Sequence, residues 1–248
     1  MAAADAPPNF SLEGIPPRDE GDVVRESTAT AAPPPTNAAP GLKNFCFVDD
    51  DSALAGCEYP GTPPPADPPA AATGAVDGDA KVGDVVAAVA AAGPFRTVIN
   101  LTEAPHPAAA ALYAAGVAAV HVPVADFAAP TLAQMRAVAA IAADPAQSPV
   151  LVHCRAGIGR TGTMLAVGLA ARWHREGRLP PPSTPEEVAA AADAAAAAAT
   201  GHVRGRRPVA RESERFVAFK ALERAAVADF VADLWASGSS GTADVPPS

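Results

Sequence analysis

The segment HCRAGIGRTGT, at positions 153–163, combines residue types that can bind and cleave a phosphate ester. Arg160 follows Cys154 by six positions, and two glycines lie between them. Glycines allow the backbone to turn so that successive N–H groups converge on an anion. The predicted phosphate-binding residues are Arg155, Ala156, Gly157, Ile158, Gly159 and Arg160.

Cys154 and Arg160 are the two residues of this segment with distinct chemical roles. At this spacing, the Arg160 guanidinium can reach across the loop and bind two phosphate oxygens in a bidentate manner. The helix expected to begin near Thr161 adds the positive end of its dipole. The same donors stabilise a thiolate at Cys154, which is the nucleophilic form of cysteine. A buried structural thiol is the ordinary alternative for one cysteine, whereas a nucleotide-binding Walker loop would require Gly-Lys-Ser/Thr, which is missing.

The elements that would position this loop alternate between strands and helices. Residues 149–153 predict a β-branched strand that runs into the loop, and residues 161–175 predict a helix that is buried almost all round. Further strands are expected at 44–48, 52–57, 95–101 and 117–124, and further helices at 82–92, 107–116, 130–143, 184–199 and 211–234. This alternation predicts an α/β domain with a mostly parallel central sheet and helices on both of its faces.

Composition and charge set the frame around this domain. Residues 1–40 and 237–248 hold few large apolar side chains, so we expect two disordered tails around one folded domain at 41–236. The net charge of −9 argues against nucleic-acid binding. Three cysteines indicate reduced thiols, and no apolar run is typical of a membrane span. We expect a monomer in the cytoplasm, with the nucleus as a second location.

The order His153-Cys154-x5-Arg160-Thr161 resembles the signature of the protein tyrosine phosphatase superfamily. The wider pattern is similar to the small atypical dual-specificity phosphatases, and the matching pieces are Asn44-Phe45, Leu54-Ala55-Gly56, Leu101-Thr102-Glu103, Asp126-Phe127 with Pro130, and residues 153–166. The resemblance implies a phosphatase-like fold that acts on phosphotyrosine, and on phosphoserine or phosphothreonine, of a protein substrate. It further implies a phosphocysteine intermediate and neither metal nor cofactor.

The resemblance also implies roles for three residues beside the loop. Thr161 would donate a hydrogen bond to the thiolate, His153 would orient the loop, and Asp126 would be the general acid. From the residues alone, His153 could equally be a core histidine. Asp126 could instead cap the helix that starts at Thr131.

Two departures from the family pattern concern turnover. Ala125 stands before the acid, where the family usually has proline, and this change would loosen the loop. The family glutamine that positions water after the Arg207-Pro208 segment is missing, and Ser213 or Glu214 falls near its place. We expect slower hydrolysis of the phosphoenzyme.

Other residues leave alternatives open. Glu103 could pair with Arg160 or remain a solvated carboxylate, and His106 is predicted at the surface. Cys46 and Cys57 could form a disulfide between neighbouring strands or remain two half-buried thiols. A basic run is predicted either to attract phosphorylated partners or to be an ordinary charged surface; it comprises Arg204, Arg206, Arg207 and Arg211.

Two other functions are compatible with the loop. The first is a phosphatase of a phosphoinositide or an RNA 5′-phosphate, although lipid-specific relatives tend to have two lysines where this loop has Arg155 and Ile158. The second is a non-catalytic phosphate-binding module. A binding module needs neither nucleophile nor acid, so the presence of both Cys154 and Asp126 favours an enzyme.

Overall fold

The computed structural model describes residues 39–61, 78–207 and 217–238 of the chain. Five strands form one sheet in the order β1-β2-β5-β3-β4. The first two strands are antiparallel and all other neighbours are parallel. The strands are β1 (Cys46–Phe47), β2 (Leu54–Cys57), β3 (Thr97–Asn100), β4 (Ala118–His121) and β5 (Val150–His153). The predicted mostly parallel sheet is confirmed.

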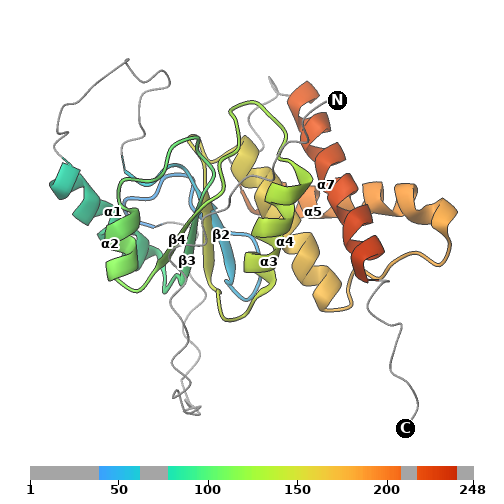
Figure 1. Cartoon of the computed structure of the whole chain (residues 1–248), viewed down its shortest axis with the longest axis horizontal. Helices are drawn as coiled ribbons and strands as arrows, with labels where there is room; N and C mark the ends of the chain where they lie inside the picture. The colour runs from blue at the N-terminus through green and yellow to red at the C-terminus, as the bar shows by residue number, and fades with distance from the viewer. Residues whose placement is uncertain (1–38, 62–77, 208–216, 239–248) are drawn as a thin grey trace, which may run out of the picture.

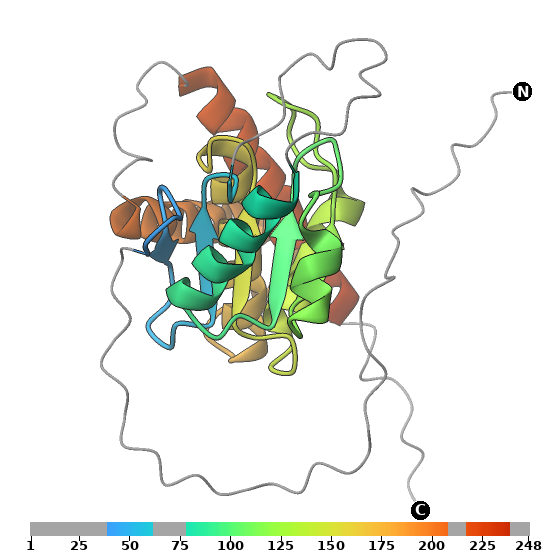
Figure 2. The ribbon, with the colours of Figure 1, turned by 90° about the vertical axis from the view of Figure 1, so that its left-hand side faces the viewer.

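Helices cover both faces of this sheet, as predicted (Figures 1 and 2). One face packs against α1 (Gly78–Ala92) and α2 (Ala109–Ala114). The other face packs against the remaining helices, which are α3 (Leu132–Ala143), α4 (Gly159–Arg175), α5 (Val188–Arg206) and α7 (Val217–Gly238). A short 3-10 turn, η1 (Pro185–Glu187), leads into α5 where the sequence predicts a proline-initiated helix.

Side chains of β5 and of Cys154 after it alternate between the two faces of the sheet. Val150 and Val152 belong to the apolar core beneath α4, whereas Leu151 belongs to the core beneath α1. Side chains alternate between the two faces of a strand. Cys154 continues this alternation and lies in the α4 core.

Helix α4 begins at Gly159, two residues before the predicted start. Arg160 therefore lies in the first helical turn and not in the loop. Residues 160–172 are largely buried, which confirms the prediction of a central helix. Its first turn carries no side-chain cap, because the residue at the cap position is Ile158.

Some predictions fall at or beyond the limits of the described residues. Those on residues 1–38, 62–77, 208–216 and 239–248 lie outside them. At the chain ends, Ala39 pairs with Leu42, and α7 continues to Gly238.

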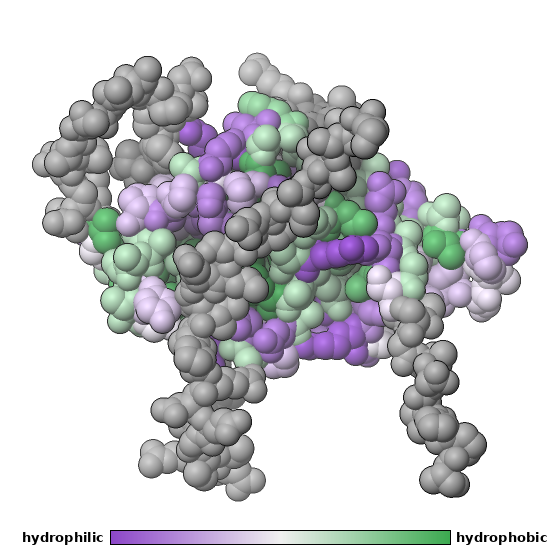
Figure 3. Space-filling view, viewed as in Figure 1, coloured by the Kyte–Doolittle hydropathy of each residue, from purple (hydrophilic) through white to green (hydrophobic). Residues whose placement is uncertain are grey.

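Among these ranges, no helix combines the length and apolarity needed to cross a membrane. The face drawn in Figure 3 shows hydrophilic and hydrophobic residues interspersed. Tyr113 and Phe127 are the large apolar side chains that the structure exposes.

Candidate active site

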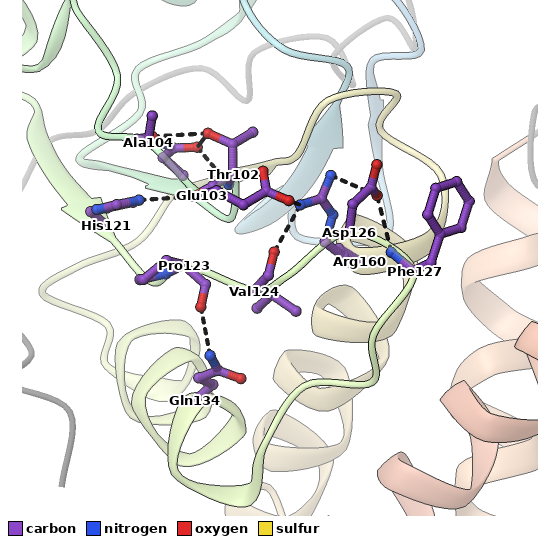
Figure 4. A network of polar contacts seen from close by, with 11 residues as sticks. Thr102, Glu103, Ala104, His121, Pro123, Val124, Asp126, Phe127, Gln134 and Arg160 are labelled. Atoms are coloured by element: carbon purple, nitrogen blue, oxygen red, sulfur yellow. Dashed lines mark hydrogen bonds and ion pairs between the residues drawn. The ribbon is translucent and has the colours of Figure 1, made fainter. Parts of the chain in front are cut away.

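The predicted site residues meet at the carboxyl ends of the parallel strands. Glu103 follows β3, Asp126 follows β4, and Cys154 follows β5. In open α/β sheets, ligands bind at this edge. Figure 4 shows Glu103 and Asp126 on either side of Arg160. The structure thus brings Glu103 and Asp126, from two other segments of the chain, next to Arg160.

Arg160 is buried, and its guanidinium contacts both neighbouring loops. Nη1 donates to Glu103 Oε1 at 2.9 Å and to the Val124 carbonyl at 2.8 Å. Nη2 lies 2.9 Å from Asp126 Oδ1. The predicted pairing of Glu103 with Arg160 is confirmed. The planar fork is thereby held by carboxylates, groups whose oxygens a phosphate can replace.

Glu103 is fixed by the loop that follows β3. Partial burial raises the pKa of Glu103, but backbone hydrogen bonds and the Arg160 cation outweigh burial, so the net pKa is lowered. Asn100 accepts from the Thr102 backbone at 2.9 Å and donates to the Ala104 carbonyl at 2.8 Å. His121 closes this network by contacting the Thr102 carbonyl at 2.8 Å. Glu103 is therefore an ionised anchor for Arg160.

Asp126 does not cap the following helix, so that interpretation is wrong. Thr131 is the N-cap of α3, and it forms a capping box with Gln134. Gln134 Nε2 also donates to the Pro123 carbonyl at 2.5 Å, which ties the segment that carries Asp126 to α3. The residue after the acid, Phe127, has a positive φ of 57° and is 66% exposed. The half-exposed carboxylate of Asp126 is left to face Arg160.

The loop between Cys154 and Arg160 presses against the end of β2. Gly157 has a φ of +69°, and a Cβ there would lie 2.5 Å from the Cys57 carbonyl oxygen and from the Glu58 nitrogen. Only glycine fits such a position. The Arg155 carbonyl accepts from the Tyr59 amide at 3.2 Å. The predicted need for a glycine in this turn is confirmed at Gly157.

His153 lies behind the loop in an aromatic cluster with Tyr59 and His106. Its ring meets both neighbours edge-on at 5.4 Å, and those two rings stack on each other at 4.5 Å. Neither ring nitrogen of His153 has a hydrogen-bond partner in the parts of the chain described. Burial, and then His106, lower the pKa of His153 to about 3. His153 is a neutral core residue, and its orienting role stays a prediction.

The prediction of a surface position for His106 is wrong. His106 is 7% exposed, and its Nδ1 accepts from the Ala108 amide at 3.1 Å. Nε2 therefore donates to the Pro60 carbonyl, 3.1 Å away. Sequence reasoning missed this because a histidine between two prolines reads as an exposed loop. The structure makes it a link between the end of β2 and the start of α2.

The three cysteines are all buried free thiols. Cys46 pairs in register with Gly56, so Cys57 projects from the opposite face of the sheet. The alternative of a disulfide between them is therefore wrong, and so is half-burial, since each is at most 2% exposed. Cys154 is also 2% exposed. Thr161 is buried and its hydroxyl has no partner in the described chain, so its predicted hydrogen bond to the thiolate is not formed here.

The arginines of the basic run after residue 203 differ in exposure. Arg204 is exposed and Arg206 pairs with Asp50, but Arg207 is only 2% exposed. The prediction of a charged surface is therefore wrong for Arg207; Arg211 lies outside the described residues. Arg207 Nη2 donates to the Asn44 carbonyl at 3.0 Å, and Asn44 Nδ2 donates to the Ala156 carbonyl at 3.2 Å. No periodic signal in the sequence separates Arg207 from its exposed neighbours.

Comparison with known protein families finds a match for the central part of the chain. Residues 78–174 match the family model described as polymorphic toxin system, DSP-PTPase phosphatase. This part of the chain is similar to DSP-PTPase phosphatases. The phosphatase-like segment contains Glu103, Asp126, Cys154 and Arg160, whereas Arg207 lies beyond it. A search of curated proteins found no match.

Several solved structures are similar in outline. PTPMT1 is 15% identical, with 79% of this chain and 99% of that chain covered and a TM-score of 0.49. The catalytic domain of the PP-IP phosphatase SIW14 from S. cerevisiae is 15% identical, with coverages of 82% and 95% and a TM-score of 0.46. Tk-PTP in its active form is 22% identical, with coverages of 73% and 96% and a TM-score of 0.40.

Proposed function

We propose that the chain is a cysteine-dependent phosphatase that hydrolyses phosphotyrosine on proteins, and phosphoserine or phosphothreonine as further substrates. The observation that carries the proposal is the position of Arg160. Its buried guanidinium lies in the first turn after the Cys154 loop and contacts both Glu103 and Asp126. A nucleophile, an anion clamp and a carboxyl group are thus available to one phosphate.

The reaction would proceed in two balanced steps. The Cys154 thiolate attacks phosphorus, the S–P bond forms, the ester P–O bond breaks, and Asp126 gives its proton to the departing oxygen. Water then attacks phosphorus, the S–P bond breaks, and Asp126 accepts the proton of the water. Arg160 and the loop N–H groups would stabilise the equatorial oxygens in both steps.

Substrate binding would change the partner of Asp126. A phosphate dianion competes with Asp126 Oδ1 for Nη2 of Arg160, because both are anionic acceptors. Once displaced from Arg160, the Asp126 carboxyl group would be available to the departing oxygen of the ester. Glu103 would keep its bond to Nη1 and hold the clamp in place.

The preference for phosphotyrosine is supported by the surroundings of Asp126. Phe127 is 66% exposed and directly follows the acid. An exposed aromatic ring offers a stacking surface to the phenyl ring of an aryl ester. An alkyl phosphate lacks that ring, so we expect serine and threonine esters to be the slower substrates.

Cys154→Ser tests the proposed function. Hydrolysis of an aryl phosphate should be lost, because a serine hydroxyl is not ionised at neutral pH, while the unfolding temperature changes little. Cys46→Ser is the matched control, since a serine can donate to the same Phe47 and Arg206 carbonyls as the Cys46 thiol. Substantial activity in Cys154→Ser would contradict the thiolate mechanism.

Substrate class is tested on the unsubstituted protein. Phosphotyrosine, phosphothreonine and inositol-lipid substrates are assayed at equal concentration, and we expect kcat/KM to fall in that order. Turnover of the inositol lipid alone would replace the protein substrate by a lipid. Binding of inorganic phosphate without turnover of any ester would make the chain a binding module.

A further inference from the structure

Arg207 is a buried cation without a carboxylate partner in the described ranges. It follows the last residue of α5, and its side chain is 2% exposed. Nη2 donates to the Asn44 carbonyl, but Nε is buried without a partner in those same ranges. Arginine keeps its charge inside proteins. A buried guanidinium is costly unless an anion or several acceptors compensate it.

The place of Arg207 is set by Gly56 in β2. A Cβ at Gly56 would lie 3.5 Å from Cζ of Arg207 and 2.9 Å from Cγ2 of Thr161. The guanidinium therefore lies over β2, on the face of the sheet covered by α4 and beside the first turn of that helix. Gly56 pairs with Val152, and Cys154 lies two residues further along on the same face. Arg207 and Cys154 therefore lie on the same face of the sheet, over the neighbouring strands β2 and β5.

Burial lowers the pKa of Arg207, and three nearby cysteines, Cys57, Cys46 and Cys154, oppose that shift. The Cys46 thiol lies 2.9 Å from the Phe47 carbonyl and 3.0 Å from the Arg206 carbonyl, which share its one proton, and burial raises its pKa. Burial raises the pKa of Cys57, whose side chain packs in the core on the other face.

Cys154 is the thiol that remains. It directly precedes the loop that leads into α4, whose first turn carries no side-chain cap. The other charged groups on these elements are already engaged: Glu58 accepts from Asn44, Arg206 pairs with Asp50, and Arg160 pairs with Glu103 and Asp126.

We propose that Arg207 is a positioning residue that stabilises the thiolate form of Cys154 from behind the loop. This inference rests on the proposed function only in taking Cys154 as the nucleophile. Arg207 acts through its charge, and through Asn44, whose carbonyl it binds and whose amide group holds the Ala156 carbonyl of the loop. It does not contact the reacting phosphate, so its effect is on the ionisation of the nucleophile.

The test measures thiolate formation directly. The difference in ultraviolet absorbance between the protein and its Cys154→Ser variant is followed across pH, in the background of Arg207→Met, Arg207→Lys and the matched control Arg204→Met. Arg207→Met removes a buried charge, so the midpoint of thiolate formation should rise by about one pH unit. Arg207→Lys keeps the charge and should restore much of the shift. Arg204→Met, an exposed site, should leave the midpoint unchanged.

The pH profile of kcat/KM separates this role from a structural one. In Arg207→Met the acid limb should move with the absorbance midpoint, and activity should recover above it. A merely structural defect would lower kcat/KM at every pH. An unshifted midpoint in folded Arg207→Met would overturn the inference.

A second measurement tests the inference without Arg207→Met, in case that variant does not fold. The Nε–H resonance of Arg207, followed by NMR in the unsubstituted protein, should shift at the midpoint of thiolate formation and should not shift in Cys154→Ser. A signal that ignores thiolate formation would overturn the inference. Because ionisation is measured without turnover, an Arg207-dependent midpoint in a protein that hydrolyses no phosphate ester would refute the proposed function alone.

Discussion

Arg160 controls both charged groups on which turnover would depend. Its guanidinium binds Glu103 through Nη1 and Asp126 through Nη2. Glu103 is the anchor, since its lowered pKa keeps it ionised. Asp126 is proposed as the exchangeable partner, because it is the carboxyl group that would give its proton to the departing oxygen; both carboxylates are about half exposed. In the proposed mechanism, phosphate would displace Asp126 from Arg160, and the Asp126 carboxyl group would then be available for proton transfer.

The Asp126→Asn variant tests this exchange. The substitution keeps the size of the side chain but removes its acidic proton, so kcat should fall by roughly 10²-fold. The loss should shrink for aryl phosphates with acidic phenols, which need no proton on departure. Inorganic phosphate should inhibit the variant at least as strongly as the unsubstituted protein, because the competing anion at Arg160 is gone. The measurement is kcat against leaving-group pKa, together with the inhibition constant of phosphate.

Asp84→Asn, an exposed change of the same chemistry on α1, is the control and should retain full activity. Parallel leaving-group plots for Asp126→Asn and the unsubstituted protein would remove Asp126 from the mechanism. Glu103 would then be the next carboxylate to test.

At the scale of the elements, two glycines near the junction of β5 and α4 lie in different environments. Gly157 has a positive φ, and a Cβ there would meet the β2 backbone at 2.5 Å. Gly162, in the first turns of α4, has open space around the same position. The two positions therefore separate a steric requirement of the turn from the general effect of adding a methyl group.

We expect Gly157→Ala to displace the loop and to lower kcat/KM on the order of 10²-fold, because small misplacements of a reacting group are that costly. Gly162→Ala should keep the activity and stabilise the fold by up to about 1 kcal/mol, since alanine is the better helix former. Kinetic assays and denaturant unfolding of both variants make the comparison. Equal activity of the two would show that the β2 end does not constrain the loop.

For the whole molecule, two buried histidines, His106 and His153, make stability depend on pH. Burial lowers the pKa of His106 and, with the help of His106 itself, that of His153, which falls to about 3. Both are neutral in the folded protein, and in the unfolded chain they titrate near 6.5. The unfolded state therefore binds more protons below that pH. Stability is fully present above about pH 6.5 and is lost as pH falls toward 3.

Protonation of His153 in the unfolded state should lower the unfolding free energy by about 2 kcal/mol between pH 7 and pH 5. Denaturant unfolding at the two pH values, repeated for His153→Asn, should show a smaller loss in the variant. His174→Asn, a half-buried site on α4, is the control and should keep the acid dependence of the unsubstituted protein. An identical pH dependence in His153→Asn would show that His153 accepts a proton without unfolding.

Local pattern was sufficient to predict most of the fold. The strand at 149–153, the buried helix after it and the alternation of strands and helices all follow from side-chain periodicity, which depends only on neighbouring residues. The phosphate loop is equally local: Cys154, its glycines and Arg160 lie within seven positions. Their chemistry could therefore be stated from types and spacing, and Gly157 and Arg160 occupy the places that this chemistry requires.

Contacts between distant segments decided the rest. Whether Glu103 was a solvated carboxylate or the partner of Arg160 depends on the order of β3 and β5 in the sheet. Thr131, not Asp126, caps α3, because the segment that holds Asp126 folds back onto Arg160. His106 and Arg207 look like surface residues in sequence, yet both are buried against segments about 45 or more positions away. Burial is a property of packed surfaces from several elements, so no local pattern of the chain specifies it.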